Sequence, residues 1–80
     1  MGAWIRVEYW DKRSKSQFIG KIMSVDSDGM YEVKFLKKSK IGQFYVFPEN
    51  DDTDIIEKRQ IVELLNEPNF NSRGHYVFDA

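Results

Sequence analysis

The stretch FIGKIMSVDSDGMYEVKFL, residues 18–36, decides the fold class because two β-rich segments flank one strong turn signal. Residues 18–25 are rich in β-branched and aromatic side chains, and residues 31–35 alternate between apolar and polar ones. Between them, Asp28-Gly29 is a dipeptide typical of tight turns between paired strands. We therefore predict an antiparallel hairpin over this stretch.

Residues 4–10, upstream of the hairpin, also alternate, which predicts another strand with two distinct faces. Ile5, Val7 and Tyr9 lie on one face, and Trp4, Arg6, Glu8 and Trp10 lie on the other. A polar loop over residues 11–17 leads into the hairpin, where Gly20 indicates a bend or a close approach of the backbone.

Downstream of the hairpin, residues 44–47 predict a short fourth strand that Pro48 stops. An acidic connection follows, in which Thr53 or Asp54 is able to cap a helical turn. Residues 55–65 suit either a ten-residue helix or one helical turn followed by a strand over 61–64. We favour the second, because the four strands already predicted need a partner.

The chain therefore predicts an all-β domain of five short antiparallel strands that close into a small, strongly bent barrel. Residues 75–78 add a last short strand, which we expect to pair with the amino-terminal strand and to cover a remaining edge. The predicted core consists of Ile5, Val7, Ile22, Tyr31, Val33 and Ile61.

Composition bounds the class of protein further. Eighty residues make one domain, and the absence of cysteine fits a reducing intracellular compartment. No run reaches the ~18 apolar residues of a membrane span. The net charge of −1 argues against a general nucleic-acid binder, although lysine and arginine cluster in two loops and an acidic block covers residues 49–57.

The order of the strands, with FIGKI, the DG turn, YEVKF, FYVFP and QIVEL at these spacings, resembles the Tudor domain and its SH3-like barrel relatives. The resemblance covers residues 4–65 and leaves 66–80 as a carboxy-terminal extension packing on the barrel. It implies a five-stranded SH3-like barrel with a short helical turn before the last barrel strand. It also implies a non-catalytic, monomeric module in the nucleus, in a chromatin or RNA-processing protein.

Tudor domains bind peptides with methylated lysine or arginine, such as histone tails or Arg/Gly-rich proteins, in a cage of aromatic rings. By the positions of the family's cage, the resemblance implies walls at Trp10, Phe18 and Phe35 and a fourth wall at Tyr45 or Phe44. A polar residue that holds the cation would be Asn50 or Asp52. The loop before residue 44 is longer than in the compact Tudor pattern. Electrostatic support for the peptide is expected from the basic loops, at Lys12, Arg13, Lys37 and Lys38.

Other interpretations stay open at this point. Trp10, Phe18 and Phe35 could be core residues, since twelve aromatic rings in a chain of this length cannot all be exposed. A small barrel with basic loops and aromatic rings could bind single-stranded nucleic acid, or the rings could form a groove for an unmodified peptide. An enzyme is the weakest class, because no nucleophile lies beside a base in a recognisable motif. No cofactor or metal is expected.

Overall fold

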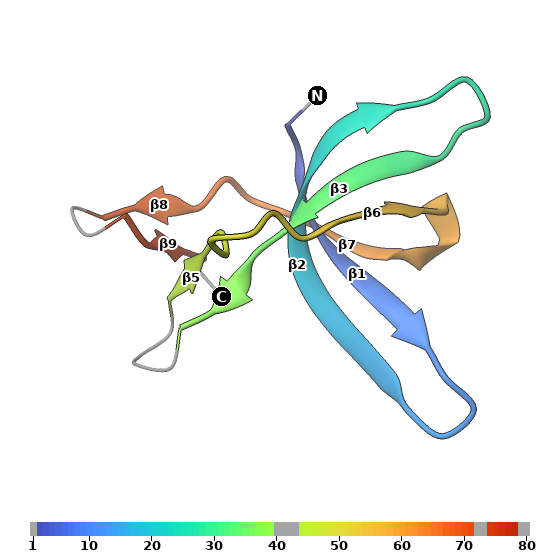
Figure 1. Ribbon diagram of the computed structural model, residues 1–80, viewed down its shortest axis with the longest axis horizontal. Coiled ribbons are helices and arrows are strands. Elements are labelled where there is room, and N and C mark those ends of the chain that lie inside the picture. Colours follow the sequence, from blue (N-terminus) through green and yellow to red (C-terminus); the bar gives the residue numbers. More distant parts are fainter. Residues whose placement is uncertain (1, 40–43, 72–73, 79–80) are drawn as a thin grey trace.

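The computed structural model describes residues 2–39, 44–71 and 74–78, which form two antiparallel β-sheets (Figure 1). The five-stranded sheet has the order β6 (Thr53–Ile56), β3 (Tyr31–Phe35), β2 (Lys15–Val25), β1 (Trp4–Trp10) and β7 (Ile61–Leu65). The four-stranded sheet has the order β4 (Lys37–Lys38), β5 (Tyr45–Val46), β9 (Tyr76–Val77) and β8 (Asn69–Phe70). A 3-10 turn, η1 (Lys58–Gln60), leads directly into β7. The predicted all-β class is confirmed.

The hairpin of β2 and β3 is present as predicted, with Gly20 opposite Phe35 and Val25 opposite Tyr31. The backbone amide of Gly29 donates to the carbonyl of Asp26 at 3.1 Å, and Gly29 has a φ of 81°. This left-handed conformation is open to glycine without steric cost, which explains why the DG dipeptide occupies the turn.

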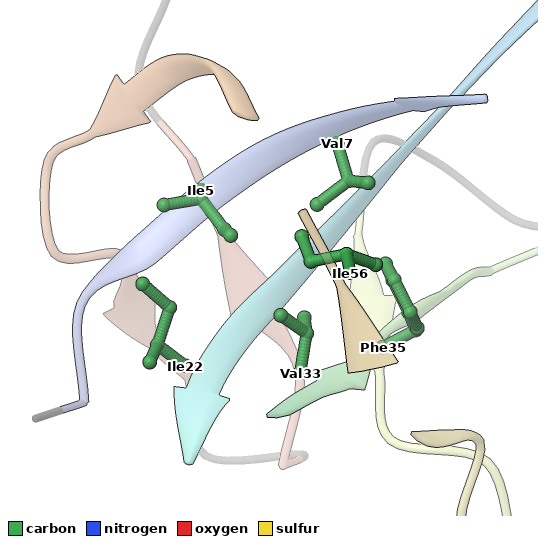
Figure 2. Close-up of a cluster of buried hydrophobic side chains, with 6 residues drawn as sticks. All are labelled: Ile5, Val7, Ile22, Val33, Phe35 and Ile56. Carbon is green, nitrogen blue, oxygen red and sulfur yellow. The ribbon is translucent and has the colours of Figure 1, made fainter. Parts of the chain in front are cut away.

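The main core lies on one face of the five-stranded sheet. The side chains that converge there are Ile5, Val7, Ile22, Val33, Phe35 and Ile56 (Figure 2). Tyr31 and Ile61 are partly buried against this cluster, so the six residues of the predicted core do pack together. Phe35 and Ile56 are additions that the prediction did not contain.

A second cluster lies on the opposite face of β1 and β2, between the two sheets. Its buried members are Trp4, Ile19 and Leu36. Partly buried side chains from the four-stranded sheet and its flanks, among them Tyr45 and Tyr76, pack against them. The buried and partly buried aromatic rings of these clusters are therefore divided between two cores.

The five-stranded sheet is open over the residues that the structure describes. Its edge strands, β6 and β7, stand at the two ends of the strand order, and no pairing in the described ranges joins them. The two sheets lie on either side of the crossing point of β1 and β2 in Figure 1. A small all-β domain of two sheets is what these residues form.

The predicted short strand at 44–47 is present as β5, but the prediction of a helical cap at Thr53 or Asp54 was wrong. Those residues belong to β6, a strand that was not predicted and that pairs with β3, and the 3-10 turn starts after Glu57. Residues 53–56 follow a run of acidic side chains, which are rare in strands, but pairing with β3 overrides that preference.

The tail strand also pairs differently from the prediction. Tyr76 lies opposite Tyr45 and Phe70, so β9 joins β5 and β8. The amino-terminal strand β1 already has β2 on one edge and β7 on the other. It therefore has no free edge for a further strand. The strand β7 follows η1 directly, which confirms the preferred interpretation of residues 55–65 as one helical turn followed by a strand.

Candidate functional site

A small pocket of about 240 Å³ opens where aromatic residues of β1, β2 and β3 meet. We call it the aromatic pocket, and its lining residues are Tyr9, Phe18, Phe35, Asp52, Thr53 and Asp54. Three of them are rings on three adjacent strands, and the other three belong to the start of β6 and the residue before it.

The three rings contact one another at inclined angles, and Phe18 meets both of the other rings edge to face. The ring centroids of Tyr9 and Phe18 are 5.7 Å apart with an interplanar angle of 69°. Phe35 lies 6.1 Å from Tyr9 and 6.2 Å from Phe18, with angles of 52° and 74°. The rings therefore form inclined walls and not a parallel stack.

Strand register brings these rings together. Phe18 is opposite Val7 in the pairing of β1 with β2, and Tyr9 is two residues further along β1, so both point to the main-core face. Phe35 is opposite Gly20, and a Cβ atom at Gly20 would lie 3.1 Å from Phe35 Cδ1. The missing side chain at Gly20 thus leaves the space that the Phe35 ring uses.

The rings differ in accessibility. Phe35 is only 5% exposed and belongs to the main core, so it forms the floor of the pocket. Phe18 is 46% exposed and forms an outer wall that a ligand can reach.

The other side of the aromatic pocket is acidic. The Tyr9 hydroxyl donates a hydrogen bond to Asp54 Oδ2 at 2.9 Å, while the Asp52 carboxylate is exposed. Burial raises the pKa of Tyr9, and the hydrogen bond to Asp54 together with the negative charges of Asp54 and Asp52 raises it further. The phenol therefore stays protonated in alkaline solution, above the pH at which an ordinary tyrosine loses its proton.

Trp10, expected from the resemblance as the first cage wall, lies on the opposite face of β1. Its indole donates a hydrogen bond to Glu8, which also accepts one from Gln17 at 2.8 Å, and these bonds lower the pKa of Glu8. The Arg59 guanidinium lies 5.8 Å from the centroid of the Trp10 ring. The ring that actually contacts Phe18 and Phe35 is Tyr9.

A second and larger pocket, of about 570 Å³, adjoins the first. We call it the large pocket. Its apolar lining consists of Phe18, Ile19, Leu36, Tyr45 and Pro48. Its polar and charged lining consists of Arg6, Gln17, Lys37, Lys38, Asn50 and Asp52.

The remaining predicted site residues divide among these surfaces. Tyr45 and Asn50 line the large pocket with Lys37 and Lys38, and not the aromatic pocket. Phe44 stacks on His75, with ring centroids 5.3 Å apart.

The other basic pair, Lys12 and Arg13, is exposed in the loop between β1 and β2. Neither residue lines the aromatic or the large pocket. The four basic residues expected to support a ligand thus occupy two separate places.

Two site residues were missed from the sequence, Tyr9 and Asp54. For Tyr9 the signal was present, because the alternation of residues 4–10 puts it on the face of Ile5 and Val7. For Asp54 it was not, because only the pairing of β6 with β3, in which Asp54 is opposite Val33, brings this carboxylate to Tyr9.

In the part of the chain that the structure describes, no group of three or more His, Cys, Asp or Glu side chains is placed to hold a metal ion. The described residues also include no helix with the length and apolar character needed to cross a membrane. A comparison with protein-family models found no match, and comparisons with curated proteins and with solved structures found none either.

Proposed function

We propose that this protein is a non-catalytic binding module that recognises a methylated lysine or methylated arginine side chain of a peptide in the aromatic pocket. The observation that carries the proposal is the meeting of three mutually inclined rings, Tyr9, Phe18 and Phe35, with the carboxylates of Asp52 and Asp54. The rings recognise the methylation of the ligand's side chain, and the carboxylates recognise its positive charge.

The rings select for methylation. A methylated ammonium or guanidinium group keeps its positive charge but has fewer N–H donors, so it loses less when water is removed from it. Aromatic faces attract such a cation by about 0.5–2 kcal/mol per contact. An unmodified side chain has more hydrogen bonds to water, which the rings cannot replace.

The carboxylates select for positive charge. Asp52 and Asp54 line one side of the aromatic pocket, and none of the lining residues carries a positive charge. A cation there is attracted by both carboxylates, whereas an apolar side chain of similar shape gains nothing from them. The volume of about 240 Å³ suits one side chain and not a larger ligand.

We also propose that the five-stranded sheet is an SH3-like barrel of the Tudor kind, in a widely open form. The support is the strand order, in which β1 pairs with both β2 and β7, together with the 3-10 turn directly before β7. In this assignment the aromatic pocket lies at one end of the barrel, beside the ends of β1 and β3.

Calorimetric titration with peptide pairs that differ only in methylation tests the function. Histone-tail and Arg/Gly-rich sequences, unmodified and methylated, are the first choice. We expect methylated peptides to bind more tightly than unmodified ones. Phe18→Ala should lower the affinity for methylated peptides about tenfold, because an exposed ring wall is lost.

Trp10→Ala is the matched control. Trp10 is 47% exposed and Phe18 46%, but Trp10 lies on the other face of β1, so we expect its loss to change affinity less than about twofold. Equal affinity for methylated and unmodified peptides would refute the proposal. Loss of binding in Trp10→Ala but not in Phe18→Ala would move the site to the opposite face.

A further inference from the structure

The aromatic pocket and the large pocket share two lining residues, Phe18 and Asp52. A ligand that reaches past the Phe18 ring therefore enters both pockets. The two pockets differ in charge, because the aromatic pocket contains the carboxylates of Asp52 and Asp54 and no cation. The large pocket contains three cationic residues and one carboxylate.

The cations of the large pocket are not equally available. Arg6 Nε donates to Glu63 Oε1 at 2.8 Å, so its charge is largely compensated. Lys37 and Lys38 are exposed, and neither forms an ion pair with another residue of the part that the structure describes. These two lysines on β4 therefore give this pocket its available positive charge.

The floor beneath these lysines is apolar. Ile19 and Leu36 are buried members of the second cluster, and Tyr45 packs against it from β5. The pocket thus combines an apolar surface with two lysines at its rim. That arrangement suits a side chain with an aliphatic stem and an anionic end.

We propose that the large pocket binds an acidic side chain, Asp or Glu, of the same peptide whose methylated cation occupies the aromatic pocket. The inference rests on the proposed function and narrows its ligand to a short motif with a methylated Lys or Arg and a carboxylate a few residues away. Phe18 then lies between the two anchored side chains.

The charges of the surroundings favour a single carboxylate over a nucleic-acid backbone. The wall of the large pocket continues into residues 49–54, which include Glu49, Asp51, Asp52 and Asp54. A chain of phosphates would pass this whole block and be repelled along its length, whereas one carboxylate beside Lys37 and Lys38 shares the pocket with a single acidic residue, Asp52.

A peptide series tests the inference. Each peptide has one methylated residue and either Glu or Gln at one of the four positions before or after it. At one or two of these positions, we expect the Glu peptide to bind about two- to fivefold more tightly than the matching Gln peptide at low salt. The difference should shrink at high salt, because exposed charges are screened.

Paired variants separate this effect from general attraction. Lys37→Gln/Lys38→Gln should abolish the preference for Glu, while Lys12→Gln/Arg13→Gln, an equal change of charge outside both pockets, should leave it intact. Phe18→Ala should lower the affinity for the Glu peptide and the Gln peptide by the same factor, since it removes a wall of the aromatic pocket.

The two proposals fail in different ways. Methyl discrimination without a Glu preference at any position overturns the large-pocket inference and leaves the proposed function standing. Absence of methyl discrimination overturns the proposed function. A single-stranded oligonucleotide that binds through Lys37 and Lys38 and displaces the Glu peptide would overturn the assignment of the large pocket to a carboxylate.

Discussion

Tyr9 has two separate interactions through the two ends of its side chain. The ring lies against Phe18 and Phe35, and the hydroxyl donates to Asp54 across to β6. Burial of the phenol and the nearby carboxylates both favour its protonated form. One residue thus ties the aromatic side of the pocket to its acidic side.

The raised pKa of Tyr9 predicts a loss of stability at alkaline pH. Above pH of about 10, the unfolded chain releases the phenol proton while the folded protein keeps it. The unfolded state then binds fewer protons, so the free energy of unfolding falls as pH rises toward the folded pKa. Below pH of about 10 this contribution is fully present.

Urea denaturation of the parent and of Tyr9→Phe at pH 8 and pH 11 measures this effect. At pH 8 the variant should be less stable by about 0.5–1.5 kcal/mol, because the hydrogen bond to Asp54 is lost. At pH 11 the gap should narrow, since only the parent has a phenol at position 9, whose raised pKa lowers the parent's stability there. A gap of the same size at both values would show that the environment of Tyr9 does not favour its protonated form.

At the scale of elements, the β2–β3 hairpin depends on Gly20. A Cβ atom there would lie 2.4 Å from Val33 Cγ1 and 3.0 Å from the carbonyl oxygen of Lys34. Both atoms belong to the neighbouring strand, and Val33 is fully buried in the main core. The absence of a side chain therefore permits the close pairing of β2 with β3.

Gly20→Ala should lower the free energy of unfolding by about 1–3 kcal/mol, because the added methyl overpacks the core. Chemical denaturation measures it. Gly29→Asn is the control, since a Cβ atom at Gly29 would have no atom within 4 Å from any residue beyond its two chain neighbours, and Asn tolerates a φ of 81°. Equal stability of Gly20→Ala and the parent would mean that the two strands separate readily at this point.

At the scale of the whole molecule, aromatic rings hold the two sheets together on the face of β1 opposite the main core. The Trp4 ring lies 5.1 Å from the ring of Tyr76, 5.6 Å from that of Phe78 and 6.1 Å from that of Phe47. The radius of gyration is 12.9 Å. A compact domain of this length would have about 12 Å, and the excess is consistent with two sheets side by side.

Tyr76→Ala should destabilise the entire protein and not only the four-stranded sheet. Tyr76 contacts the rings of Trp4, Phe47 and Phe70, and Trp4 belongs to β1, an inner strand of the larger sheet. We expect a loss of about 2–4 kcal/mol in a single unfolding transition.

Leu64→Ala is the control for this prediction. Leu64 is 74% exposed, so its truncation should change stability by less than about 0.5 kcal/mol. Thermal unfolding followed by near- and far-ultraviolet circular dichroism compares the two variants. Two separate transitions in the parent, only one of them sensitive to Tyr76→Ala, would show that the sheets unfold independently.

Local patterns were enough to predict several features of this protein. Side-chain period and turn chemistry predict the alternation of residues 4–10 and 31–35, the DG turn and the core-facing positions of Val7 and Val33. Each of these features depends on neighbours within a few residues. For that reason the sequence by itself determined them.

Only the tertiary structure decided which distant segments meet. The sequence did not indicate a strand at residues 53–56, and the pairing of Val33 with Asp54 shows that they occupy the edge of β3. The same pairing brings Asp54 to Tyr9, while the resemblance places the first wall at Trp10, on the other face. Strand partners and shared pockets depend on edges left free by other strands across long separations, and no local period records them.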